Sequence, residues 1–206
     1  MSSACADELK TLHHRGFWHS HGPVKHTETV VFAVFGQHEC DGARLAPSAF
    51  ATDQLKKGEL SVARASHTSC DDFQKHVVSG AEAKGAFRGV VKALAGDIRA
   101  LPYTVPGAHP PKIGKALCVI DIVEEDDHDG HAALKFSDAQ ELLTAKQKSQ
   151  IRIAIKADLA ETFGEICAPE SVLRAHRNAF LRLCEKVVQK VARARDWLLL
   201  KVGRAV

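Results

Sequence analysis

The chain has 206 residues, of which 45% are hydrophobic and 26% are charged, and its formal net charge is +3. These values are ordinary for a globular protein of one large or two small domains, and they exclude a wholly disordered chain. The opening residues, MSSACADELK, have no apolar core, and no run of about 18 apolar residues occurs later, so we expect neither a secretory signal nor a membrane span.

The first predicted element is a buried strand at residues 28–35 (ETVVFAVF), a compact run of β-branched and aromatic residues. Glycines and a proline punctuate residues 37–58, which predicts a loop with one helical turn at 47–50. Residues 59–64 (ELSVAR) alternate between apolar and polar side chains, and this pattern indicates a second strand.

A short capped helix is predicted after the second strand. Ser69 and Asp72 have the spacing of a capping box, so we expect a helix that begins there and ends near Val78. The apolar residues of 86–101 fit either a strand or a helix, and two glycines weaken the helix. We therefore predict a strand followed by a helical turn.

The middle of the chain predicts a β-hairpin. Four prolines make residues 102–111 an extended loop. Residues 116–123 (ALCVIDIV) give the clearest strand signal in the chain, and an acidic connection, EEDDHDG, follows. Residues 131–136 alternate again and are expected to return as the partner strand.

Two helices are predicted in the last third. Ser137 and Gln140 form another capping box, which favours a helix over residues 138–166. One face of that helix is marked by apolar residues at every fourth position: Ile151, Ile155, Leu159 and Phe163. The connection at 167–169 is short, so the second helix, over about 169–201, is expected to form an antiparallel hairpin with the first.

The second of these helices combines an apolar stripe with many bases. The stripe steps by three, four or seven residues: Leu173, Phe180, Leu183, Cys184, Val187, Val191, Ala194 and Leu198. The helix would span roughly 45–50 Å at about 1.5 Å per residue. That length is large for a domain of this size, so part of the stripe is expected to pack on something outside the domain.

Together these elements predict an α/β or α+β fold. A small mixed sheet in residues 1–136 would pack with two long antiparallel helices in residues 137–206. We expect the basic helical hairpin to pack on the first part as one domain.

The charge is divided unevenly along the chain. Residues 171–206 hold nine Lys or Arg and two acids, a net of +7, whereas the first 170 residues hold 19 bases and 23 acids, a net of −4. Such a basic end suits a nucleic acid or an acidic protein surface, although a solvated helix face is the simpler alternative. The candidate contact residues are Arg174, Arg182, Lys186, Lys190, Arg193 and Arg195.

Histidines are dense near the N-terminus. Zinc needs three or four nitrogen or sulfur ligands that converge as a tetrahedron. The candidates for a zinc site are His19, His21, His38 and Cys40, and their spacings fit no known zinc motif. Loop histidines without a special role are the alternative.

Two segments offer catalytic groups if the chain is an enzyme. His128, His131 and Asp121 surround the acidic connection after the clearest strand, where carboxylates and imidazoles can act as acid and base. Cys70 lies at a predicted helix N-terminus, where a thiol can become nucleophilic, and His67 is close in sequence. A charged hairpin loop and a buried cysteine are the alternatives.

Several common signatures do not occur in the sequence. It has no GxxxxGK(S/T), GxGxxG, GxSxG or HExxH pattern. The signature motifs of P-loop proteins, Rossmann-type dehydrogenases, α/β-hydrolases and zincins are therefore missing from the sequence. Its six cysteines include no CxxC pair. We expect reduced thiols in a cytoplasmic protein. The sequence does not identify a cofactor.

The leading hypothesis is a non-enzymatic binding or assembly subunit that engages nucleic acid or an acidic protein partner through the basic C-terminal helix. The first alternative is a small histidine- or metal-dependent hydrolase that acts on a phosphodiester or nucleotide. The second alternative is a homo-oligomer that pairs through the C-terminal helix.

Overall fold

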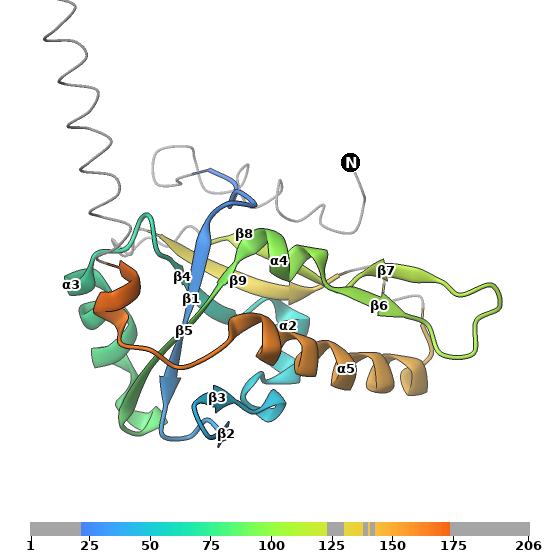
Figure 1. The fold of residues 1–206 in the computed structure, drawn as a ribbon, viewed down its shortest axis with the longest axis horizontal. Helices are drawn as coiled ribbons and strands as arrows, with labels where there is room; N and C mark the ends of the chain where they lie inside the picture. The colour runs from blue at the N-terminus through green and yellow to red at the C-terminus, as the bar shows by residue number, and fades with distance from the viewer. Residues whose placement is uncertain (1–21, 123–129, 138–139, 141–142, 174–206) are drawn as a thin grey trace, which may run out of the picture.

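The computed structural model describes residues 22–122, 130–137, 140 and 143–173. An antiparallel sheet in the order β5-β1-β4-β9-β8 forms its centre (Figure 1). The strands are β1 (Thr29–Phe35), β4 (Leu60–Arg64), β5 (Phe87–Leu94), β8 (Leu117–Asp121) and β9 (His131–Phe136). All five predicted strands are thereby confirmed, and the architecture is α+β.

The sheet is wholly antiparallel, so the prediction of a mixed sheet is wrong. Parallel neighbours need a long crossover connection, usually a helix. The α-helices between these strands are α2 (Thr52–Lys57), α3 (Cys70–Asp72) and α4 (Ala95–Ala100), and each is too short for that purpose. The hairpin of β8 and β9 was predicted and is confirmed.

Shorter elements connect the strands. The predicted helical turn is η3 (Pro47–Ala49), and the helical turn after β5 is α4. Ser69 caps α3 as predicted, because its side chain accepts the backbone N–H of Asp72. That helix continues as the π-helical η4 (Phe73–Val78) and the segment η5 (Ser79–Lys84).

Three features of the connecting segments were not predicted. Helix α2 lies where a loop was expected, and the small hairpins β2–β3 and β6–β7 were missed. Their bounds are β2 (Cys40–Asp41), β3 (Arg44–Leu45), β6 (Pro102–Thr104) and β7 (Ile113–Lys115). Strands of two or three residues are too short to leave a periodic pattern in the sequence.

The two faces of the sheet bury two separate apolar clusters. The larger cluster packs β-strand residues such as Phe32, Val62 and Leu134 against the helix α5 (Ala145–Phe163). In this cluster Phe163 stacks on Phe50 with ring centroids 5.7 Å apart. The smaller cluster lies on the opposite face and includes Phe73 of η4.

Helix α5 begins later than predicted. Its cap is Thr144, which forms a capping box with Gln147, instead of the predicted box of Ser137 and Gln140. The side-chain amide of Gln140 is buried and donates to the carbonyl of Ala116 at 2.8 Å, so this residue ties the chain to the edge of the sheet. The apolar residues at every fourth position do form the buried face of α5, as predicted.

The predicted connection at 167–169 does not make a tight helical hairpin. Gly164 ends α5, and Cys167 then forms an antiparallel bridge with Val90 of the edge strand β5. Gly89 permits this approach, because a Cβ there would lie 2.8 Å from the carbonyl oxygen of Cys167. Residues 169–173 are helical, and Val172 and Leu173 join the smaller cluster. The chain therefore crosses from one face of the sheet to the other, and this segment does not begin beside α5.

Only part of the predicted C-terminal helix can be compared with the structure. Its residues from 174 onward lie outside the described part, whereas Leu173, the first member of the predicted stripe, is buried. None of the described helices is both long and apolar enough to cross a membrane.

Candidate functional site

A buried ion cluster joins β4, β8 and the residue that precedes β1 at one end of the sheet. The side chain of Arg64 is fully buried and donates to both carboxylate oxygens of Glu28, at 2.8 and 2.9 Å. Its Nη1 donates to Asp121 at 2.6 Å and to the carbonyl of Gly22 at 2.9 Å. Asp121, a predicted catalytic candidate, is therefore ion-paired within the core.

The electrostatics of this cluster favour the charged form of Glu28. Burial by itself would raise the pKa of Glu28, but hydrogen bonds from Arg64 and from the backbone N–H of Lys25 outweigh it. The charges of Arg64 and His67 act in the same direction, so the pKa is lowered overall. His67, another predicted candidate, lies with its Nε2 3.8 Å from Glu28. A paired carboxylate held in its charged form suits a structural role better than proton transfer.

A second buried arginine holds the same end of the molecule. Arg99 is 7% exposed and donates to the carbonyls of Val24 and Val119, at 2.7 and 2.8 Å. Arg64 of β4 and Arg99 of α4 thus hold the backbone of residues 22–24 against the sheet. Guanidinium groups suit this task because each offers several donors in one plane.

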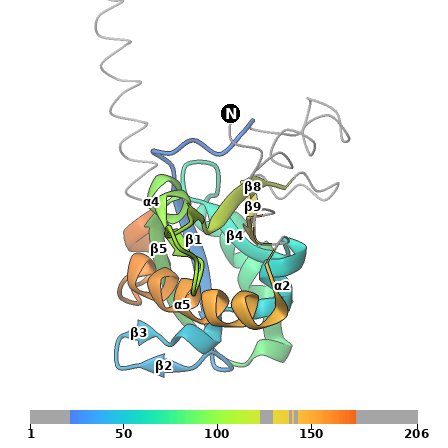
Figure 2. The ribbon, with the colours of Figure 1, turned by 90° about the vertical axis from the view of Figure 1, so that its right-hand side faces the viewer.

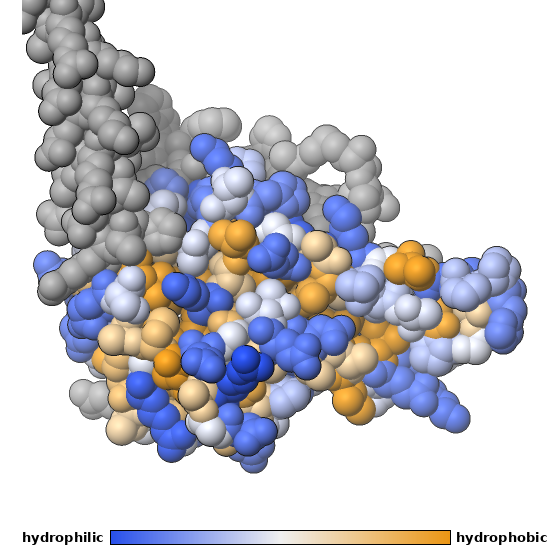
Figure 3. Space-filling model, viewed as in Figure 1, coloured by the Kyte–Doolittle hydropathy of each residue, from blue (hydrophilic) through white to orange (hydrophobic). Residues whose placement is uncertain are grey.

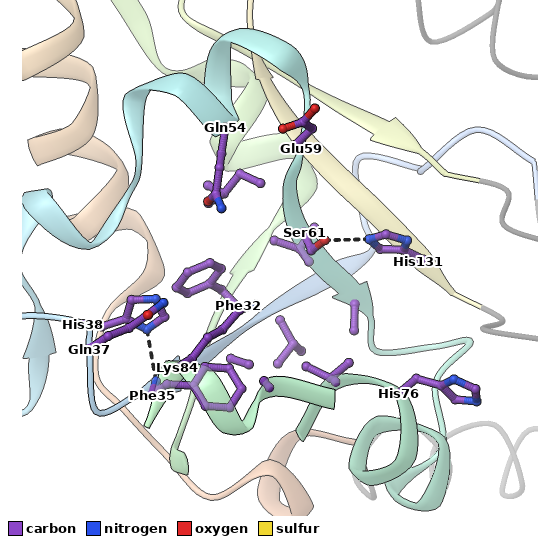
Figure 4. A pocket seen from close by; sticks show the side chains of 17 residues that line it. Phe32, Phe35, Gln37, His38, Gln54, Glu59, Ser61, His76, Lys84 and His131 are labelled. Atoms are coloured by element: carbon purple, nitrogen blue, oxygen red, sulfur yellow. Dashed lines mark hydrogen bonds between the residues drawn. The ribbon is translucent and has the colours of Figure 1, made fainter. Parts of the chain in front are cut away.

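A hollow opens on the sheet where two strands part. β1 and β4 pair only at Val30–Arg64 and Val31–Ala63. Beyond this point β1 continues beside β5, and β4 continues beside β9. The resulting space has a volume of about 280 Å³, and we call it the sheet hollow (Figure 4). It is lined by β1, β4 and β9, by the segment 76–84, and by residues from the turn after β1 and from α2.

The sheet hollow contains one of the predicted catalytic candidates. His131 of β9 is paired with Ala63 of β4, and its Nε2 lies 2.9 Å from the Oγ of Ser61, two residues along the same strand. In the register of β8 and β9, Asp121 is paired with Ala132. His131 and Asp121 therefore point to opposite faces of the sheet. The structure separates these two candidates instead of joining them as an acid–base pair.

His38 lines the other side of the sheet hollow. Its Nδ1 accepts the backbone N–H of Phe35 at 3.0 Å, which satisfies the edge of β1 where β4 has parted from it. Burial lowers the pKa of His38, and the nearby charges of Lys84 and Arg88 lower it further. This histidine is therefore held in its neutral form.

The remaining candidates do not form a metal centre in the described part. Cys40 lies with its Sγ 3.6 Å from Arg88, and no described group of three or more His, Cys, Asp or Glu residues could hold a metal ion. Cys70 lies in the first turn of α3, half-buried, as a free thiol. His19, His21 and His128 lie outside the described residues.

One cysteine departs from the expectation of reduced thiols. Cys118 of β8 is disulfide-bonded. Cys40, Cys70 and Cys167 are free thiols. The expectation that every thiol of the chain is reduced is therefore wrong for Cys118.

A second concave surface is strongly basic. It lies between α2 and the first half of α5, which run close together in Figure 2. We call it the basic groove. It has a volume of about 330 Å³, and its lining residues are Thr52, Lys56, Ala145, Lys148, Ser149, Arg152, Ile153 and Lys156. This lining carries four bases, two hydroxyl groups and no acid.

The bases of the basic groove form an ordered row. Lys148, Arg152 and Lys156 are spaced by four residues, so they follow one another along α5 about 6 Å apart. The guanidinium of Arg152 is held 5.0 Å from the ring centroid of Phe136. On the face drawn in Figure 3, hydrophilic side chains lie over α5 with hydrophobic ones among them. The remaining base, Lys56, is bound to the acid Asp53 of α2 at 2.8 Å.

Sequence reasoning missed both the basic groove and the centre of the ion cluster. The row in α5 repeats at the same interval as the buried apolar face and could have been found there. Arg64 falls on the same side of its strand as Leu60 and Val62, and a base in the apolar row of a strand is a signal for a buried ion pair. The predicted basic contact residues from Arg174 to Arg195 lie beyond the described part of the chain.

Comparisons with protein-family models, with curated proteins and with solved structures found no match.

Proposed function

We propose that this chain is a nucleic-acid-binding subunit that contacts phosphates without reading base sequence. The observation that carries the proposal is the basic groove, whose lining holds the row of Lys148, Arg152 and Lys156 and no acid, while its fourth base is paired with Asp53. The second support is the net charge of +7 in residues 171–206 against −4 in the rest of the chain. Clustered bases of this kind supply sequence-independent affinity for a polyanion.

The chemistry of the basic groove favours phosphate over protein carboxylates. Lysine, arginine, serine and threonine side chains are the usual partners of phosphate oxygens. Thr52 and Ser149 place hydroxyl groups among the bases. Lys148 and Lys156 are half-buried, so their charges are less screened than those of fully exposed lysines. No aromatic side chain lines the groove as described, so the proposed contact is with the backbone of the nucleic acid.

The test uses the full-length protein and a fluorescent duplex of mixed sequence. Fluorescence anisotropy at about 50 mM salt should show binding, and an unlabelled duplex of unrelated sequence should compete equally well. Poly-glutamate of equal charge serves as the acidic-protein competitor. Stronger competition by poly-glutamate than by the unlabelled duplex would assign the surface to an acidic protein, and absence of duplex binding would refute the proposal.

A histidine-dependent hydrolase is a second candidate. The observation in its favour is the hydrogen bond of 2.9 Å between Ser61 and His131 inside the sheet hollow. A serine beside an imidazole can act as a nucleophile with a base. Hydrolysis of a chromogenic phosphodiester that is lost in His131→Ala and in His128→Ala would support it. Equal rates in the wild type and in both variants would exclude it.

Self-association through the C-terminal helix is the third candidate. Light scattering of the full-length protein separates it from the other two, because a homo-oligomer would show a mass well above the monomer mass of 22.4 kDa. A monomer over a wide concentration range would exclude it.

A further inference from the structure

We propose that the sheet hollow is a binding site for a small carboxylate with a short apolar body. This inference is independent of the nucleic-acid surface, because it concerns a different part of the molecule, a hollow with an apolar floor and a cationic end. It rests on the parting of β1 and β4, on the residues that line the gap, and on the charges at its rim.

The shape of the sheet hollow follows from the strand register. β1 and β4 pair through Val31 and Ala63 and then separate, while each keeps its other neighbour. An antiparallel pair that separates leaves backbone donors and acceptors on both inner edges. Phe35 illustrates this, since its N–H is satisfied by the His38 side chain in place of a strand. A ligand in the gap would therefore meet backbone polar groups as well as side chains.

The floor of the sheet hollow is apolar. It is formed by Val31, Ala33 and Ala63, whose side chains lie on the face of the sheet that carries the smaller cluster. Val77 and Ala81 of the segment 76–84 add to it. All five are small or medium-sized, which is why the space is not filled. A volume of about 280 Å³ corresponds to about nine water molecules at roughly 30 Å³ each, so it suits a ligand of about that many non-hydrogen atoms.

One end of the sheet hollow is cationic. Lys84 lines it, and its Nζ lies 5.6 Å from the ring centroid of Phe35. No ion pair of Lys84 occurs among the described side chains. The lowered pKa of His38 reports, after burial, the positive field of Lys84 and Arg88 at the same place. A carboxylate is the ligand group that this field would hold most firmly.

The opposite end is polar and carries an acid. Ser61 is exposed towards the space and shares its hydrogen bond with His131 (Figure 4). Glu59 also lines this end, and its carboxylate lies 3.9 Å from Lys57. The acid at this end repels a second anionic group, so the site favours a ligand with one carboxylate rather than two.

The test is a binding experiment with hexanoate and hexanamide, which have the same size and differ in charge. Binding to the full-length protein is followed by amide chemical shifts in two-dimensional NMR. We expect hexanoate to shift the amides of Ala33, Ser61 and His131 and to bind at least about tenfold more tightly than hexanamide. Decanoate, which exceeds the volume of the sheet hollow, should bind there more weakly than hexanoate.

Two variants test the assigned residues. Lys84→Met removes the cation and keeps the length of the side chain, so hexanoate binding should weaken by about tenfold or more while hexanamide binding stays the same. Ala33→Leu fills the floor and should abolish the binding of both. Lys92→Met is the matched control, because Lys92 is an exposed lysine of β5 outside the hollow. The thermal melt of each variant shows whether it is folded, and Lys84, on an exposed segment, allows the test even if Ala33→Leu fails to fold.

Three results would refute the proposal. The first is equal affinity for hexanoate and hexanamide. The second is a set of shifted amides that lies outside the sheet hollow. The third is no saturable binding of hexanoate at millimolar concentrations. Loss of hexanoate binding in Lys84→Met but not in Lys92→Met would confirm both the ligand class and the place.

Discussion

Replacing Arg64 tests how the ion cluster contributes to stability. In Arg64→Met, Glu28 and Asp121 lose the guanidinium that pairs with them. Both acids are buried, with 9% of Glu28 and 5% of Asp121 exposed. Removing one partner of such a cluster costs about 3–5 kcal/mol, because the remaining charges stay buried and unpaired. For a chain of this length the melting temperature should fall by roughly 6–20 °C.

The loss of stability in Arg64→Met should depend on pH, because it depends on the charge of Glu28. In the wild type the pKa of Glu28 is lowered from 4.5, so the pair stabilises the fold above that pH and its contribution is lost as the pH falls through the folded pKa. In Arg64→Met burial acts without the guanidinium and raises the pKa of Glu28. As the pH falls, Glu28 of the variant becomes protonated and no longer buries an unpaired charge. The difference in the free energy of unfolding between the two proteins should therefore become smaller from pH 7 to pH 5.

Urea denaturation of both proteins at pH 7 and at pH 5 measures this gap. A companion variant, Arg64→Met with Glu28→Gln and Asp121→Asn, removes every charge of the cluster and should recover most of the lost stability. The reasoning fails if Arg64→Met costs less than about 1 kcal/mol, if the gap is the same at both pH values, or if the companion variant is no more stable than the single one.

Two further predictions concern Gly89 and His38. Gly89→Ala should lower the free energy of unfolding by about 2 kcal/mol or more in urea denaturation, because the φ of +137° and the carbonyl oxygen of Cys167, 2.8 Å from the new Cβ, both oppose it. The control variant Gly107→Ala should lower it less, because Gly107 has a φ of +74° and open space around it. In an NMR titration the pKa of His38 should lie below 6.5 and should rise in Lys84→Met. His38 therefore contributes stability that is present above pH 6.5 and is lost as the pH falls through its folded pKa, and a pKa of 6.5 or above would contradict the assignment.

The sequence predicted the strands well because each carries a strong local signal. The run at 28–35 and the run at 116–123 are compact and apolar, and both strands are buried. The start of α5 was predicted seven residues early, because Ser137 and Gln140 have the spacing of a capping box, whereas Gln140 donates instead to the carbonyl of Ala116. Such a long-range hydrogen bond leaves no trace in local periodicity.

The sites were harder to predict, because each depends on contacts between distant parts of the chain. Asp121 was predicted as a catalytic candidate from its place in the strand before the acidic connection, but its partner Arg64 is 57 residues away. Ser61 and His131 are 70 residues apart and meet only through the register of β4 and β9. The sheet hollow arises from the parting of two strands, which no single segment encodes.

The salt dependence of duplex binding tests the central claim most directly. Each phosphate contact contributes about 0.9 to the slope of log affinity against log salt concentration. We predict that Lys148→Gln combined with Lys156→Gln lowers the magnitude of that slope by about 1.8, whereas Lys75→Gln combined with Lys92→Gln, which removes two exposed charges elsewhere, leaves it unchanged. An equal slope for the wild type and the groove variant would contradict the claim that the basic groove binds phosphates.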